Sequence, residues 1–265
     1  MNNRYIGALI IAPFIMFLFI GGIYLKYGVM ILSLFGMYEF YRVIKEKNIQ
    51  AISIAGYILC IIYYITLDKT VDYRMHFFFL IITMFIIMCI PIFDVEYNFI
   101  DISTTIMGFL YVAVFFSFIV LVDNKNYGNY LVWLIFISSW VCDTAAYYAG
   151  RAFGKRKLCP KVSPKKTIEG SIGGMIGSTL ACGILGYLIH SRIDFIPIYH
   201  FFAIGAICGV FCQFGDLTAS SIKRYVGVKD YSNLIPGHGG ILDRFDSILF
   251  SSVVVYYYLT FIVGI

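Results

Sequence analysis

The chain has 265 residues, of which 60% are hydrophobic and only 13% are charged, and its formal net charge is +5. Soluble domains are about 45–50% apolar and about 25% charged, so this composition excludes an ordinary soluble protein. Apolar runs of about 17–25 residues, long enough to cross a bilayer, recur along the chain. The alternating segments of a membrane β-barrel are absent. We therefore predict an all-α, polytopic integral membrane protein.

Nine apolar segments are candidate membrane spans. The first contains a run from Ile6 to Ile23 that is long for the apolar part of a cleavable signal peptide, and no small-residue cleavage site follows it closely. We read this run as a membrane helix. The predicted spans are residues 5–25, 27–43, 51–67, 76–93, 103–122, 130–149, 172–190, 197–215 and 247–265.

The basic residues predict the orientation of these spans, because Lys and Arg favour cytoplasmic loops. If the N-terminus is cytoplasmic, 15 of the 20 basic residues lie in inner loops. This distribution predicts a cytoplasmic N-terminus and a C-terminus outside. The positive charge is then an orientation signal, and no nucleic-acid partner is expected. The five outer basic residues are Lys26, Lys69, Arg74, Lys125 and Arg192.

Polar residues are concentrated in the second half of the chain. Two long loops there, residues 150–171 and 216–246, are both predicted to be cytoplasmic. We therefore divide the chain into N-terminal scaffold helices, residues 1–125, and a catalytic transmembrane region, residues 126–265. The sequence has no HExxH motif and no clustered Cys and His, which argues against a zinc enzyme.

Four acidic residues stand out because ionisable groups at membrane depth are costly and usually functional. Asp143 lies within a span, Asp216 ends another, and Asp243 and Asp246 begin the last one. The last two are three residues apart, so a helix would place both carboxylates on one face. Such oxygen ligands suit Mg²⁺ beside a phosphate. The alternative is that the acids cap helices by complementing the helix dipole.

A glycine-rich turn, IPGHGG at residues 235–240, precedes the last span. Glycine lets backbone N–H groups approach a ligand closely, and the start of a helix favours anions. Gly237, Gly239 and Gly240 are therefore candidates for binding substrate phosphate. His238 either donates to a phosphate or caps the turn.

Two basic clusters lie on the same predicted side of the membrane as the acids. One contributes Lys223, Arg224 and Lys229, with Arg244 nearby, and these are candidates for phosphate contacts during catalysis. The other, SPKKT, contributes the candidate substrate-binding residues Ser163, Lys165, Lys166 and Thr167, although it is not a P-loop. Two other roles would also explain the basic loops. They could orient the chain in the membrane, or they could bind anionic lipid head groups.

The segment SSIKRYVGVKDYSNLIPGHGGILDRFD, residues 220–246, resembles the signature of the CDP-diacylglycerol synthases, also called phosphatidate cytidylyltransferases. The segments CDTAAYYAGRAFGK, SPKKTIEGSIGG and GDLTASSIKR also resemble that family. The resemblance is strong from about Asp143 to Ser247, whereas the first 120 residues match only in apolar character. Departures from the family pattern at Ala145, Ser232 and Ile168 remove no charged residue.

The resemblance implies that CTP and phosphatidate react to give CDP-diacylglycerol and pyrophosphate, with Mg²⁺ as cofactor and a second cation left open. Asp216, Asp243 and Asp246 are then expected to bind metal, with Asp143 as a further ligand or a supporting residue. The resemblance also makes a homodimer an expectation. We expect the protein to lie in the bacterial plasma membrane with its site facing the cytoplasm. Membrane lipids are then expected as partners.

Two alternatives stay open at this point. A CTP-dependent polyprenol or phytol kinase would transfer the γ-phosphoryl group to an alcohol, and would need a base near the metal. An ion or metal transporter would place acids near the middle of the bilayer, on broken helices of repeated halves. The acids here gather at one interface and no inverted repeat is evident, which favours an enzyme.

Overall fold

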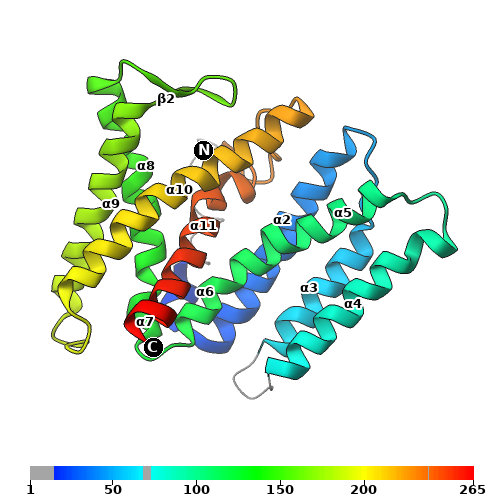
Figure 1. The fold of residues 1–265 in the computed structure, drawn as a ribbon, viewed down its shortest axis with the longest axis horizontal. Helices are drawn as coiled ribbons and strands as arrows, with labels where there is room; N and C mark the ends of the chain where they lie inside the picture. Colours follow the sequence, from blue (N-terminus) through cyan, green and yellow to red (C-terminus); the bar gives the residue numbers. More distant parts are fainter. Residues whose placement is uncertain (1–14, 68–72, 238) are drawn as a thin grey trace. The chain divides into compact units, whose positions relative to one another are not determined.

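The structure is a computed structural model that describes residues 15–67, 73–237 and 239–265. The described chain is mostly helical (Figure 1). The all-α prediction did not include the two short strands that the chain also contains. The elements are α2 (Gly22–Lys45), α3 (Ser53–Thr66), α4 (Tyr73–Phe93), α5 (Phe99–Gly108), η1 (Phe109–Val114), α6 (Phe115–Asp123), α7 (Gly128–Leu131), α8 (Trp133–Phe153), β1 (Lys157–Cys159), β2 (Ser163–Thr167), α9 (Ile168–Ile189), α10 (Ile198–Val226), α11 (Leu242–Tyr258) and η2 (Leu259–Val263).

Within the described residues, five helical stretches are long and apolar enough to cross a membrane. This finding fits the predicted integral membrane protein. The number nine stays a prediction, since α3 has only 14 residues and a span needs about 20. The five stretches are Phe99–Asp123, Gly128–Phe153, Ile168–Ile189, Ile198–Val226 and Leu242–Val263.

Two predicted boundaries are wrong. The chain does not break between residues 25 and 27, because α2 is continuous and the break comes at Gly21, whose φ is 67°. This left-handed conformation favours glycine. The predicted loop 216–246 is shorter than expected because α10 continues to Val226 and α11 begins at Leu242. The ends of these helices are polar, so hydropathy alone assigns them to a loop.

The chain forms two compact units. The first contains Met1–Val120 and Val226–Asp243, and the second contains Leu121–Tyr225 and Arg244–Ile265. The segment Val226–Asp243, with the glycine-rich turn, therefore belongs with the N-terminal helices. The functional division at residue 125 stays a prediction.

Apolar helices of the first unit are joined by a few buried polar contacts. The Tyr41 hydroxyl donates to the Thr105 carbonyl oxygen at 2.7 Å, and Ser33 and Tyr64 share a hydrogen bond of 2.8 Å. The Asp101 carboxylate accepts from the backbone N–H of Gln50 at 2.7 Å. In an apolar surrounding, a polar group without a partner is costly, so these contacts fix how α2, α3 and α5 pack.

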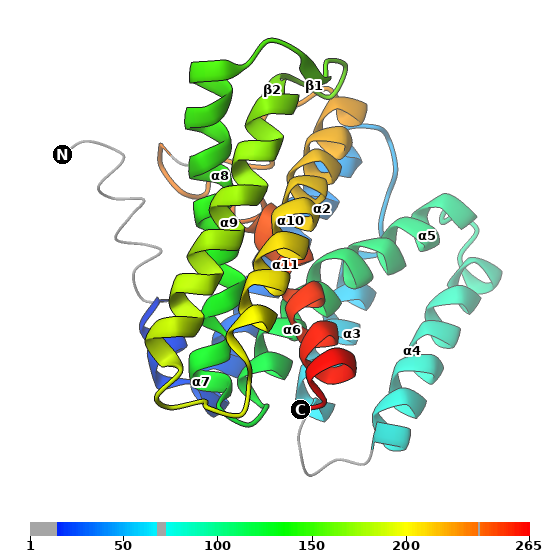
Figure 2. The ribbon, with the colours of Figure 1, turned by 60° about the vertical axis from the view of Figure 1, so that its left-hand side comes forward.

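The second unit places α8 beside α9, with the β1–β2 hairpin connecting them at one end (Figure 2). The strands pair antiparallel, with Cys159 opposite Ser163. Small residues allow the helices to approach closely, since a Cβ on Gly173 would overlap the Ala149 side chain. This small-residue packing is typical of membrane helices. Gly215 of α10 lies against the backbone of Asp246 in α11 in the same way.

Candidate functional site

A charged cavity of about 390 Å³ lies in the second unit, where the hairpin meets α8, α9 and α10. We call it the charged cavity. Its walls bring together five residues that the sequence predicts to be functional, from three separate parts of the chain. These residues are Asp143, Lys165, Lys166, Thr167 and Asp216.

The hairpin is attached to the start of α9 by two polar contacts. The Thr167 hydroxyl accepts from the Gly170 N–H at 3.1 Å, which caps α9. The Glu169 carboxylate accepts from the backbone N–H groups of Lys155 and Arg156 at 3.0 Å and 3.3 Å. Both ends of the hairpin are therefore held, and this positions Lys165 and Lys166 at the cavity.

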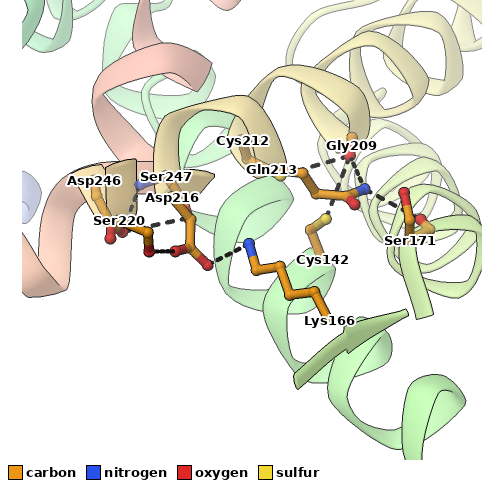
Figure 3. A network of polar contacts seen from close by, with 10 residues as sticks. All are labelled: Cys142, Lys166, Ser171, Gly209, Cys212, Gln213, Asp216, Ser220, Asp246 and Ser247. Atoms are coloured by element: carbon orange, nitrogen blue, oxygen red, sulfur yellow. Dashed lines mark hydrogen bonds and ion pairs between the residues drawn. The ribbon is translucent and has the colours of Figure 1, made fainter. Parts of the chain in front are cut away.

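An ion pair crosses the charged cavity. The Lys166 Nζ lies 2.5 Å from the Asp216 Oδ2, and the two side chains are 26% and 28% exposed. The Ser220 hydroxyl donates to the other oxygen of Asp216 at 3.2 Å. Figure 3 shows Asp216 between these two partners. Asp216 is thus oriented by neighbours on both sides.

Asp143, Asp216 and Asp246 lie close enough to one another to interact electrostatically. The Asp246 carboxylate accepts from the Ser247 N–H at 2.7 Å. Positive side chains attract the same acids. Lys166 and Arg244 interact electrostatically with Asp143, and Lys223 interacts with Asp246. Three acids and three bases from four elements therefore share one region of the second unit.

This acidic cluster suits Mg²⁺ in its chemistry, since Mg²⁺ prefers carboxylate oxygen. Among the residues that the structure describes, no three His, Cys, Asp or Glu side chains are grouped tightly enough to hold a metal ion by themselves. Mg²⁺ usually keeps several waters and uses one or two carboxylates together with substrate phosphates. The donor set therefore fits a metal that is bound together with substrate.

Asp243 is assigned to the first compact unit, whereas the other predicted metal ligands are assigned to the second. Its carboxylate accepts from the N–H groups of Tyr231 and Gly240 at 2.8 Å and 3.0 Å. These two contacts tie the glycine-rich loop to the start of α11. A metal-binding role for Asp243 stays a prediction.

The glycine-rich turn is closed by two backbone hydrogen bonds, in which Ile235 and Gly239 each donate to the other at 2.9 Å and 3.1 Å. Gly237 and Gly239 have φ values of 75° and 85°, which favour glycine. In this structure the N–H groups of Gly239 and Gly240 are engaged within the loop. Anion binding by the three glycines stays a prediction. His238 lies outside the described residues.

Glu39 of α2 is a residue that the sequence analysis missed. It is 0% exposed, and its carboxylate accepts from the Ser232 hydroxyl at 2.5 Å and from the N–H groups of Ile241 and Leu242, both at 2.9 Å. An acid within an apolar run is a signal that would have identified it. Glu39 fixes the loop that carries the family signature and the start of α11.

The structure also describes three other predicted residues, Lys229, Arg224 and Ser163. Lys229 lines a separate pocket of about 280 Å³ in the first unit, beside Arg42 and Glu46. Arg224 of α10 donates from Nε to the Val162 carbonyl oxygen at 3.4 Å, and Ser163 begins β2. The sequence analysis also missed four polar or aromatic residues that line the charged cavity, namely Tyr147, Arg151, Ser171 and Gln213.

The described chain therefore combines helices long and apolar enough to cross a membrane with a cavity lined by both acids and bases. The model of the cytidylyltransferase family matches residues 2–262. The chain therefore belongs to the cytidylyltransferase family, which confirms the family resemblance.

Similar bacterial proteins are named phosphatidate cytidylyltransferase. The one from Bacillus subtilis is 29% identical over 272 residues, which cover 98% of this chain and 97% of the relative. Those from Staphylococcus saprophyticus and Staphylococcus haemolyticus are 40% and 38% identical over 156 and 155 residues. Each of these two matches spans 58% of this chain and 58% of the relative's length.

Proposed function

We propose that the protein is a phosphatidate cytidylyltransferase, which transfers CMP from CTP to phosphatidate and releases pyrophosphate. The observation that carries the proposal is the charged cavity, where Lys165 and Lys166 face Asp143 and Asp216. Membership of the family and the names of the relatives support the same reaction.

The reaction needs little acid–base chemistry from the protein. A phosphate oxygen of phosphatidate attacks the α-phosphorus of CTP, and the bond from that phosphorus to the oxygen bridging to the β-phosphate breaks. The attacking oxygen is already an anion at neutral pH, so the main obstacles are charge repulsion and orientation. Lys165, Lys166 and Lys223 would offset the repulsion, and Arg224 and Arg244 would hold charge on the leaving pyrophosphate.

The carboxylates of Asp143, Asp216 and Asp246 would hold Mg²⁺, and we keep Asp243 as a further candidate. Bound Mg²⁺ would supply positive charge beside the transferring phosphoryl group. A second cation at the same acids is part of this proposal, since three acids lie within electrostatic reach of one another.

We also propose that the charged cavity faces the cytoplasm of a bacterial cell, at the surface of the plasma membrane. There CTP arrives from water and phosphatidate from the lipid. The distribution of basic residues and the bacterial relatives support this placement. The nine spans, the cytoplasmic N-terminus, the outer C-terminus and a homodimer belong to this proposal.

Product analysis with labelled CTP tests the proposed reaction. Purified protein would be incubated with phosphatidate, Mg²⁺ and CTP labelled at either the α- or the γ-phosphate. We expect the α-label in CDP-diacylglycerol and the γ-label in pyrophosphate. Transfer of the γ-label to a lipid alcohol would instead show a kinase and contradict the proposal.

A further inference from the structure

A second, apolar pocket adjoins the charged cavity in the second unit. It has a volume of about 160 Å³ and lies between α9 and α10. We call it the apolar pocket. Leu158, Ser171 and Gln213 line both spaces, so the two lie side by side there. The other residues that line the apolar pocket are Ile172, Met175, Val210, Phe214 and Leu217.

Gln213 holds the junction between the two spaces in a fixed shape. Its side-chain amide donates to the Gly209 carbonyl oxygen at 2.6 Å on its own helix and to the Ser171 carbonyl oxygen at 3.1 Å on α9. Figure 3 shows this bridge beside the Lys166–Asp216 ion pair. Only 9% of Gln213 is exposed. The side chain of Gln213 therefore ties α10 to α9 at the junction.

Charge is distributed unevenly over the two adjoining spaces. The charged cavity contains Arg151, Lys165 and Lys166 together with Asp143 and Asp216, whereas no ionisable residue lines the apolar pocket. From the hairpin, α9 passes Ile172 and Met175 as it enters its membrane-spanning stretch. The apolar pocket therefore lies along the apolar part of α9 and α10, and the charged cavity lies beside it with all of the ionisable side chains.

This polarity matches an amphiphile with an anionic head and an apolar tail. Phosphatidate has that shape, whereas CTP has no apolar part that would gain from such a pocket. Resting on the proposed function, we infer that the two spaces form the phosphatidate subsite. Lys165 and Lys166 contact the lipid phosphate, and the first methylene groups of one acyl chain lie in the apolar pocket. The lipid phosphate then lies beside Asp143 and Asp216.

A matched pair of substitutions on α9 tests this assignment. Ile172 and Ile176 are 50% and 51% exposed, but only Ile172 lines the apolar pocket. Ile172→Trp would fill the pocket, and Ile176→Trp would add the same bulk one turn further along the helix. We expect Ile172→Trp to raise KM for long-chain phosphatidate on the order of tenfold, with KM for CTP unchanged. Ile176→Trp should keep both values.

A binding readout separates this inference from the proposed function. Crosslinking of a photoreactive phosphatidate to wild type and both variants requires no turnover, and thermal unfolding of each variant confirms that it is folded. We expect crosslinking to fall only in Ile172→Trp. An equal fall in both variants, or an increase in KM for CTP instead of phosphatidate, would overturn the subsite assignment. A wild type that crosslinks phosphatidate but forms no CDP-diacylglycerol would refute the proposed function alone.

Discussion

Glu39 is the clearest case of a single residue whose contacts explain its presence in an apolar helix. Its carboxylate accepts three hydrogen bonds from the Ser232 hydroxyl and from the backbone at Ile241 and Leu242. All three donors belong to the first unit, as does α2. The N-terminal helices therefore do more than provide lipid-facing surface, because one of them orders the signature loop.

We predict that Glu39→Gln destabilises the protein and lowers its activity. The glutamine amide has the same shape, but its NH₂ group would face a backbone N–H that now lacks an acceptor. The loss of a buried hydrogen bond to a charged group costs about 1.5–3 kcal/mol. Thermal unfolding of the purified variant and its kcat for CDP-diacylglycerol formation measure both effects.

Glu46→Gln is the control for this prediction. Glu46 is exposed directly after the same helix, so its substitution should leave the unfolding midpoint unchanged. If Glu39→Gln unfolded at the wild-type temperature with full activity, the loop would not depend on the Glu39 carboxylate.

Residue types in the site were predictable from the sequence, but their partners were not. Asp216 and Lys166 both stand out as charges beside apolar runs. Their pairing depends on how the hairpin folds over the cavity, which the local sequence does not determine. For Asp243, the i, i+3 spacing to Asp246 suggested a shared role, whereas the structure assigns the two residues to different compact units.

At the scale of helices, close packing between α10 and α11 positions the acidic cluster. Gly215 precedes Asp216 and lies against the Asp246 carbonyl oxygen and the Phe250 ring. A side chain at this position would push against backbone, which cannot move aside as a flexible side chain can. Because Gly215 has no Cβ, α10 can approach α11 closely, and this brings Asp216 near Asp246.

We predict that Gly215→Ala lowers both stability and activity. On helix propensity alone, alanine would stabilise a helix by roughly 1 kcal/mol over glycine. The overlap with α11 should outweigh that gain and displace Asp216 from Asp246. The unfolding midpoint and kcat should both fall, whereas Ser221→Ala, on an exposed position of α10, should change neither. A more stable and fully active Gly215→Ala variant would show that the contact is not tight.

Helix positions could be predicted from hydropathy because long apolar runs have few alternatives in a membrane. Predicted span 51–67 corresponds to α3, and span 172–190 corresponds to α9. The ends were less predictable. Residues such as Lys223 and Arg224 extend α10 beyond its apolar part, and only backbone hydrogen bonding identifies them as helical.

For the whole molecule, the proposed orientation makes a prediction that needs no enzyme assay. With 15 of 20 basic residues on the inner side, the C-terminus should lie outside the cytoplasm. Alkaline phosphatase fused after Ile265 should therefore be active in bacterial cells, and a fluorescent protein fused there should be dark. The reverse pattern would require an even number of spans or a different position of the N-terminus.

The central claim is that the acidic cluster of the second unit supports transfer of CMP to phosphatidate. The most direct measurement compares wild type, Asp246→Asn and Asp194→Asn in one assay with purified protein, labelled CTP, phosphatidate and Mg²⁺. Asp194 is an exposed acid in the loop after α9 and serves as the control. We predict that wild type and Asp194→Asn form CDP-diacylglycerol at similar rates and that Asp246→Asn, while folded, loses at least about 100-fold in kcat. An Asp246→Asn variant nearly as fast as wild type would contradict the role of the acidic cluster, and a folded wild type that forms no CDP-diacylglycerol would contradict the reaction itself.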